Sequence, residues 1–339
     1  MKINLAIDMM GGDNGLAATA PGVAQAISQH PDLHCLLVGD ADRIRTAIKG
    51  IEAQERVQIV HASESVDMHE SPASALRSKK DSSMRVAINL LAQGQASACV
   101  SAGNTGALMA TARFVLKTLP GIDRPAIIGA LPRPDGHVHV LDLGANVDSP
   151  AEILLQFGLM GDSMVRTLEG VQRPTVGLLN VGSEEIKGSE TIKQAAELLR
   201  TSRLNYIGYV EGDDIFNGSV DIIVSDGFAG NIALKASEGL AQMLIRVMRE
   251  EFSRGLLSKI AALIAAPVLR SFRDRIDHRR YNGAMLLGLN GAVVKSHGAA
   301  DELGFHHAIG VARLAAQNDL VSHIRSDLEE FAPVERANA

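Results

Sequence analysis

Short apolar runs that alternate with helical patterns are the strongest constraint on this chain, because that alternation predicts a sheet covered by helices. The first apolar runs are 3–7, 34–38, 57–60 and 98–101. The helical patterns among them lie near 17–29, 41–49 and 83–93. Two further runs, 126–131 and 137–141, flank the hairpin signal Pro132-Arg133-Pro134-Asp135-Gly136. We therefore expect an α/β/α sandwich with a mixed, mostly parallel sheet.

Four apolar runs lead straight into loops of glycine with asparagine or aspartate. These loops are 101–106, 142–146, 180–183 and 225–231. Glycine lets a backbone approach a ligand closely, and a helix that starts in such a loop offers a positive dipole end. Because parallel strands end at one edge, we expect the four loops to converge there on a cleft for an anion or polar ligand. One such loop alone would only be an ordinary α/β turn.

Composition excludes several classes of function. Hydrophobic residues make up 46% of the 339 residues, which is ample for a large core. A net charge of -6, 3% aromatic residues and no tryptophan argue against nucleic-acid binding. Cys35 and Cys99 lie inside apolar runs, so we expect buried thiols in a reducing cytoplasm. The first residues read as a strand rather than a signal peptide, and no apolar run has the length of a membrane span.

Several catalytic motifs are missing from the sequence. It has no G-x-G-x-x-G after a strand, no P-loop and no G-x-S-x-G elbow. We find no histidines paired at metal-ligand spacing, since His306 and His307 are adjacent and would point apart on a helix. These absences argue against dinucleotide redox chemistry, nucleotide hydrolysis, serine hydrolysis and zinc chemistry. We expect neither a cofactor nor a metal.

The segment 236–280 differs in kind from the remainder. Its second half carries apolar residues on one predicted helix face, before Pro267, where we expect the helix to break: Leu256, Leu257, Ile260, Leu263 and Ile264. Residues 246–280 hold nine Lys and Arg against four Asp and Glu. This pattern favours an interfacial helix pair that contacts a membrane or an acyl chain, although a dimer interface or a core helix would also fit. We therefore divide the chain into a two-lobed α/β core, 1–235 and 281–339, and this helical segment.

Two polar segments add candidate ligands. The loop 77–84 carries Lys79, Lys80 and Ser82 at a predicted helix start, which suits a phosphate but also a solvated turn. The patch 281–298 combines Gly and Asn with Lys295 and His297. His297 is either an acid–base group or a structural histidine at a strand end.

These segments together resemble the bacterial phosphate acyltransferases, which are acyl-carrier-protein:phosphate transacylases of phospholipid synthesis. The matching stretches are 6–13, 79–84, 101–110, 141–148, 226–235 and 281–301. Met9 departs from the alanine expected in many relatives, and 69–71 lies in a segment that we expect to vary.

The resemblance implies that inorganic phosphate attacks the thioester of an acyl-carrier protein. It implies a fold similar to isocitrate and isopropylmalate dehydrogenases and phosphotransacetylases, and a homodimer. It also implies that the product passes to a membrane glycerol-3-phosphate acyltransferase, so we expect a cytoplasmic enzyme at the inner face of the cell membrane. Three rivals stay open: a metal-dependent hydroxyacid dehydrogenase, a transacylase that uses coenzyme A, and a non-catalytic membrane scaffold.

A phosphate dianion is already a nucleophile, so the site needs amide donors and lysines rather than a serine or cysteine. The candidates for catalysis are Asn104, Asn146, Asn180, Lys187, Asn231 and Lys295. The candidates for phosphate or substrate binding are Asp8, Gly11, Gly12, Lys79, Lys80, Ser82, Gly103, Thr105, Asp142, Asp226, Gly230 and His297.

Overall fold

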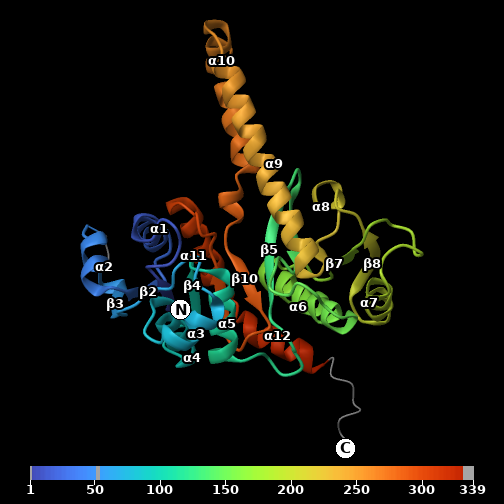
Figure 1. Cartoon of the computed structure of the whole chain (residues 1–339), viewed down its shortest axis with the longest axis horizontal. Helices are drawn as coiled ribbons and strands as arrows, with labels where there is room; N and C mark the ends of the chain where they lie inside the picture. The colour runs from blue at the N-terminus through green and yellow to red at the C-terminus, as the bar shows by residue number, and fades with distance from the viewer. Residues whose placement is uncertain (1, 51–53, 331–339) are drawn as a thin grey trace, which may run out of the picture.

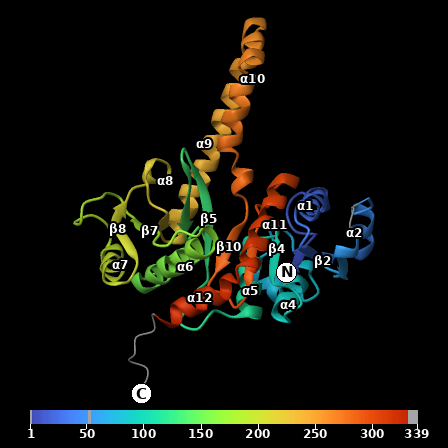
Figure 2. The same cartoon turned by 180° about the vertical axis from the view of Figure 1, so that it is seen from behind.

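The computed structural model describes residues 2–50 and 54–330, and within them the strands form one eleven-stranded sheet (Figures 1 and 2). The strands are β1 Ile3–Asp8, β2 Leu33–Gly39, β3 Val57–His61, β4 Ala98–Ser101, β5 Ala126–Arg133, β6 Gly136–Leu141, β7 Thr175–Leu179, β8 Asn205–Val210, β9 Ile222–Val224, β10 Ala284–Leu287 and β11 Ala292–Lys295. Their order across the sheet is β3-β2-β1-β4-β11-β10-β5-β6-β9-β7-β8.

Helices cover both faces of this sheet, as the sequence predicted. They are α1 Leu16–Gln29, α2 Ala41–Ala47, α3 Pro72–Ser78, α4 Ser83–Ala92, α5 Thr105–Leu116, α6 Ala151–Glu169, α7 Glu190–Thr201, α8 Asp214–Asn217, α9 Gly227–Ser253, α10 Leu256–Ile276, α11 Glu302–Gln317 and α12 Leu320–Glu329, with short 3-10 turns at Gln54–Arg56 and His278–Tyr281. One buried cluster centres on Phe157 and Phe305, and the opposite face buries Ile88 and Leu108. Central strands that are apolar on both faces are expected of such a sandwich.

The strand directions explain where the Gly/Asn loops go. The predicted hairpin is confirmed, since β5 pairs antiparallel with β6, and β10 is antiparallel to β5 and β11. Consequently β4 and β11 run opposite to β6, β9 and β7. The expectation that the four loops leave one edge is therefore wrong, because the loop after β4 leaves in the direction opposite to the other three.

The register nevertheless brings the carboxyl ends of these strands to one level. Ser101 lies opposite Lys295, and Lys295 opposite Ala284. The next residue, Met285, pairs with Ile128, which lies opposite Leu141, and Leu141 lies opposite Val224. The ends of β4, β11, β6 and β9 thus fall along a line across the sheet, within one residue, and strands approach that line from both sides.

The predicted helix pair is present as α9 and α10, which pack together and project away from the sheet (Figures 1 and 2). The prediction that Pro267 breaks the second helix is wrong, because α10 continues through Pro267 to Ile276. Both helices are largely exposed, so water can hydrogen-bond the carbonyl that Pro267 leaves without its donor. In the described part of the chain, none of the helices combines the length and apolar character needed to cross a membrane.

Candidate active site

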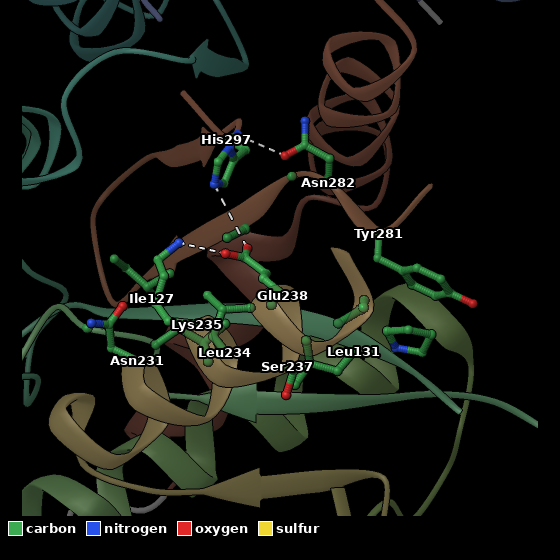
Figure 3. A pocket seen from close by; sticks show the side chains of 18 of the residues that line it. Ile127, Leu131, Asn231, Leu234, Lys235, Ser237, Glu238, Tyr281, Asn282 and His297 are labelled. Carbon is green, nitrogen blue, oxygen red and sulfur yellow. Dashed lines mark hydrogen bonds and ion pairs between the residues drawn. The ribbon is translucent and has the colours of Figure 1, made fainter. Parts of the chain in front are cut away.

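A cavity of about 930 Å³ lies beside the line of strand ends, between the β5–β6 hairpin, the first half of α9 and the residues after β11 (Figure 3). Its polar and charged lining includes Asp13, Thr105, Asn231, Lys235, Glu238, Lys295 and His297. Its apolar lining includes Ile127, Leu131, Leu143, Phe216, Leu234, Leu240, Leu244 and Phe272. A cavity of this size, with an apolar wall and a limited number of polar side chains, is typical of a ligand site.

Two neighbouring elements supply an ionic network in this cavity. Lys235 and Glu238 are three residues apart on α9, so they share a helix face, and Lys235 Nζ lies 2.8 Å from Glu238 Oε2 (Figure 3). Glu238 Oε1 lies 3.9 Å from His297 Nε2. The backbone N–H of His297 donates to Asn282 Oδ1 at 2.8 Å, which fixes the position of the histidine. Glu238 therefore pairs with a lysine of its own helix and lies next to the histidine that follows β11.

Lys295 places a second cation next to this network. It is buried at the end of β11, and its Nζ donates to Ala102 O at 3.2 Å and to Ser296 O. Burial lowers the pKa of Lys295 to about 8, although the negative charges of Asp8 and Asp13 act in the opposite direction. The charge of Lys235 also lowers this pKa, so an anion bound between the two lysines would relieve their repulsion.

The loops after β1 and β4 pack closely behind Lys295. Asp8 Oδ2 accepts from Ser101 Oγ at 2.6 Å, and Ser101 Oγ in turn accepts from Gly103 N at 3.0 Å. Burial raises the pKa of Asp8. A Cβ atom at Gly11 would lie 2.6 Å from Asp8 Oδ2 and 2.7 Å from Gly103 N, so only glycine fits there. Asp8, Gly11 and Gly103 thus set the shape of the site from behind.

Asp142 organises the loop after β6 in the same way. Its buried carboxylate accepts five hydrogen bonds, from the N–H groups of Ile127, Gly144, Ala145 and Asn146 and from Asn146 Nδ2. Burial raises the pKa of Asp142, and these hydrogen bonds oppose that rise. Any Cβ at Gly230 would overlap Asp142 O, and Asp226 Oδ1 caps α9 through Ala229 N at 2.8 Å. The loop and the helix start are therefore packed together, one turn before Lys235.

The predicted site residues fall into three groups. Four line the cavity: Thr105, Asn231, Lys295 and His297. A second group holds the loops behind it: Asp8, Gly11, Gly12, Gly103, Asn104, Asp142, Asn146, Asp226 and Gly230. The amides of Asn104 and Asn146 are used within the protein, because Asn104 caps α5 and donates to Met68 O, and Asn146 donates to Pro125 O.

The third group lies away from the cavity lining: Lys79, Lys80, Ser82, Asn180 and Lys187. Ser82 caps α4 through Arg85 N. Asn180 Nδ2 donates to Gly182 O and Lys187 O, and Lys187 Nζ forms an exposed ion pair with Glu184 Oε2 at 2.8 Å. Asn180 and Lys187 therefore lie in a loop on the outer side of β9.

The cavity also contains functional groups that the sequence patterns did not single out. Lys235 and Glu238 lie beyond the Gly/Asn loop, inside a helix where charged residues are ordinary. Their three-residue spacing, one turn after Asn231, was the available signal.

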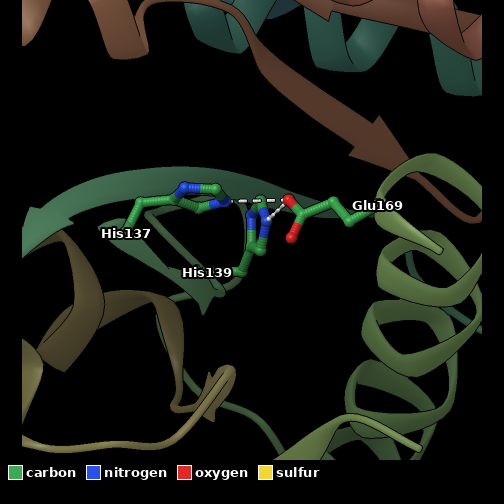
Figure 4. A group of neighbouring side chains, drawn as sticks. All are labelled: His137, His139 and Glu169. Carbon is green, nitrogen blue, oxygen red and sulfur yellow. Dashed lines mark hydrogen bonds and ion pairs between the residues drawn. The ribbon is translucent and has the colours of Figure 1, made fainter. Parts of the chain in front are cut away.

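A further group lies on the sheet face opposite the cavity wall. His137 Nε2 and His139 Nε2 both contact Glu169 Oε1, at 2.8 and 2.5 Å (Figure 4). The conclusion that histidines do not pair at metal-ligand spacing is thus wrong for these two. Residues i and i+2 of a strand point to one face, and that spacing was visible in the sequence.

Comparison with known proteins assigns the family. A model of the family described as fatty acid synthesis protein matches residues 3–323. A phosphate acyltransferase from Legionella pneumophila (strain Paris) is 56% identical over 333 residues, 97% of each chain. Another from Methylococcus capsulatus is 58% identical over 310 residues, 91% of each chain. The chain belongs to the phosphate acyltransferase family. It is accordingly an acyltransferase, and the family membership expected from the sequence is confirmed.

Solved structures confirm the predicted fold of this phosphate acyltransferase family member. A phosphotransacetylase from Streptococcus pyogenes superposes with a TM-score of 0.64 at 15% identity, covering 93% of this chain and 94% of the other. The EutD phosphotransacetylase from Staphylococcus aureus gives 0.61, with the same identity and the same coverage. A 4-hydroxythreonine-4-phosphate dehydrogenase from Klebsiella pneumoniae gives 0.52 at 15% identity, covering 94% and 99%. At these identities the likeness concerns the fold alone.

Proposed function

We propose that this acyltransferase moves a long-chain fatty acyl group from acyl-carrier protein to inorganic phosphate, giving an acyl phosphate for phospholipid synthesis. One observation carries the proposal: the cavity has two lysines at its polar end and a long apolar wall. The family assignment agrees with acyl transfer to phosphate.

The lysine end suits the phosphate. Lys235 and Lys295 supply positive charge, and the start of α5 lies beside them through Thr105. The N–H groups in the first turn of a helix have no partner within the helix, and they favour an anion. Asn104 uses its side chain to cap Ala107 N, which leaves Thr105 and Gly106 N–H for a ligand.

Asn231 suits the reacting carbonyl. It is exposed at the cavity, and its amide makes no hydrogen bond with the described residues. A phosphate oxygen would bond to the thioester carbon, and an amide donor would stabilise the negative oxygen that forms there. Collapse of this intermediate breaks the C–S bond, and the thiolate of the carrier leaves and takes up a proton. The start of α9, which carries Asn231, would be held in position by four residues that do not touch substrate: Asn146, Asp142, Asp226 and Gly230.

The apolar wall suits the acyl chain. Ile127, Leu131 and Leu143 continue toward Leu240 and Leu244 on α9, and Phe272, near the end of α10 where that helix returns to the sheet, lines the same cavity. Burying methylene groups along this wall contributes about 0.8 kcal/mol each. A long chain would therefore be held much more firmly than an acetyl group.

Purified protein mixed with palmitoyl-carrier protein tests the reaction, with and without inorganic phosphate. We expect phosphate-dependent release of both acyl phosphate and free carrier thiol, with a large loss for Asn231→Ala. Asn318→Ala, at a partly exposed residue that follows α11, is the matched control. Turnover with palmitoyl-coenzyme A but not with the carrier would replace the proposed donor. Absence of turnover with either donor would reject the proposed reaction.

The helix pair suits a membrane surface. Leu256, Leu257, Leu263 and Ile264 are each more than 75% exposed, in a segment rich in arginine. We propose that these residues, with Ile260, contact the inner face of the cell membrane, where a homodimer would deliver acyl phosphate to a membrane glycerol-3-phosphate acyltransferase.

Leu263→Glu with Ile264→Glu should abolish cosedimentation with anionic vesicles, while Lys193→Ala should leave it unchanged. Wild-type binding by the double variant would reject membrane contact. Loss of the dimer together with vesicle binding would assign the same residues to subunit packing.

The exposed 180–187 loop completes the proposal. Val181 is 79% exposed and Ile186 84% exposed, so both side chains are available for contact with another molecule. We propose that this loop closes on the carrier-bound substrate and brings Asn180 and Lys187 to the reaction. Lys79 and Lys80 would meet phosphate groups of the arriving donor, and Ser82, which is buried and caps α4, would hold the turn that carries them.

A further inference from the structure

The cluster of His137, His139 and Glu169 is separate from the proposed reaction site. Val138 and Val140 of β6 pack in the same buried cluster as Leu131 and Leu143 of the cavity wall. The alternate residues His137 and His139 point to the other face of the sheet, toward the end of α6 (Figure 4). No step of acyl transfer uses them.

The geometry points to a divalent metal site, of a kind that suits Zn²⁺, with ligands His137 Nε2, His139 Nε2 and Glu169 Oε1. These three atoms lie within 4.8 Å of one another. Two imidazoles and one carboxylate are a ligand set that Zn²⁺ accepts, with water in a fourth position.

The present contacts define what must change when the metal enters. Both imidazole nitrogens contact the same carboxylate oxygen, at 2.8 and 2.5 Å. Tetrahedral Zn²⁺ with bonds of about 2.0–2.2 Å needs neighbouring ligand atoms about 3.3 Å apart. The ion would thus replace two hydrogen bonds after the side chains open by less than an ångström, and each imidazole would carry its remaining proton on Nδ1.

The end of α6 supports a cation at this point. Glu169 is the last residue of α6, and Gly170 ends the helix in the left-handed conformation. The carbonyl groups at a helix C-terminus form its negative dipole end, which stabilises a positive charge. Asp221 adds a nearby negative charge, whereas Arg133 opposes it. The side chain of His139 is only 11% exposed, so one ligand is already held in place by packing.

A bound ion would replace the two histidine–carboxylate contacts that now join β6 to α6. It would fix the β5–β6 hairpin to the end of α6. The ring of His137 also lies 6.3 Å from that of Tyr281, which lines the cavity. The metal would therefore stabilise the outer part of the cavity wall without touching substrate.

Tag-free protein stripped with a chelator and titrated with Zn²⁺ against a chromogenic chelator tests this site. We expect one Zn²⁺ per chain, at least tenfold weaker binding in Glu169→Gln, and at least a hundredfold weaker binding in His139→Ala. His323→Ala, an exposed histidine on α12, is the control and should bind as the wild type does. Co²⁺ should give the intense visible bands of a tetrahedral site, and His139→Ala should lose them.

Stability supplies a second readout. The same excess of Zn²⁺ should raise the Tm of the wild type and of His323→Ala by more than it raises that of Glu169→Gln. If His139→Ala fails to fold, His137→Ala replaces it, because that side chain is 36% exposed. No stoichiometric binding by the wild type, or wild-type affinity in Glu169→Gln and in the histidine variant, would overturn the proposal and leave only a hydrogen-bonded triad.

Discussion

The loops after β6 and β7 have the same sequence character but are held in very different ways. Both follow an apolar strand and combine glycine with asparagine. Residues 142–146 surround one buried carboxylate that accepts five hydrogen bonds. The side chains of residues 180–187 are tied by two hydrogen bonds from the Asn180 amide and by two exposed ion pairs. Identical turn chemistry thus produces one packed loop and one open loop.

Position in the sheet accounts for the difference. β6 adjoins the β5 strand that forms the cavity wall, whereas β7 lies beyond β9. The loop after β6 is enclosed by α9 and by the start of β5, but the loop after β7 has solvent around it. A packed loop can preorganise donors, while an open loop can act only by moving.

The largest difference between the loops should appear in stability. Asp142→Ala removes the acceptor of four backbone N–H groups, so we expect the free energy of unfolding to fall by about 3 kcal/mol or more. Asn180→Ala should cost less than about 1 kcal/mol, because water can replace its partners. Urea denaturation of the two variants measures both. Equal losses would mean that the 180–187 loop is as firmly packed as 142–146.

The next largest effect should be on activity, where the buried Lys295 should matter and a surface lysine should not. Lys295→Met should lower kcat/KM by about 10²–10³, as expected for one preorganised group that stabilises developing charge. Lys193→Ala, on the outer surface of α7, is the control and should match the wild type. Wild-type turnover by Lys295→Met would remove the buried lysine from the reaction.

The buried lysine should also set a pH dependence. Its ammonium form is present below a pKa of about 8 and is lost as pH rises through that value. Loss of this charge weakens phosphate binding, so kcat/KM for phosphate should fall by about tenfold per pH unit well above the pKa. Lys295→Met should remove this decline. The same alkaline slope in the variant would assign it to another group.

The smallest effect should come from the open loop. Lys187→Ala should lower turnover about tenfold while the urea midpoint stays unchanged, since its exposed ion pair contributes little to stability. The acyl-carrier donor must be used for this measurement, because closure is proposed to follow docking. Unchanged turnover would show that the loop takes no part.

The sequence predicted local structure well and long-range arrangement less well. The β5–β6 hairpin, the α9–α10 pair and the buried Cys35 and Cys99 were all predictable, because turn signals and apolar spacing act locally. The opposed directions of β4 and β6 were not, because they depend on β10, which pairs with β5 from more than 150 residues away in sequence.

The same limit applies to the site. Asn231, Lys295 and His297 were found because they follow glycine-rich loops that reach the strand ends. Lys235 and Glu238 were missed because only the tertiary structure, which brings the first half of α9 and the residues after β11 to one cavity, turns ordinary helix residues toward a ligand site. Asn104 and Asn146 have a suitable residue type, but the backbone around them uses their amides.

Helix α9 has a mechanical consequence. It runs without interruption from Gly227 to Ser253, so it carries Asn231 and Lys235 near one end and reaches the projecting tip at the other. A straight helix of this length is a rod of about 40 Å. Pivoting it by about 5° at the cavity would sweep the tip through about 3.5 Å. The helix is thus a lever, through which a load on the tip tilts the groups at its base.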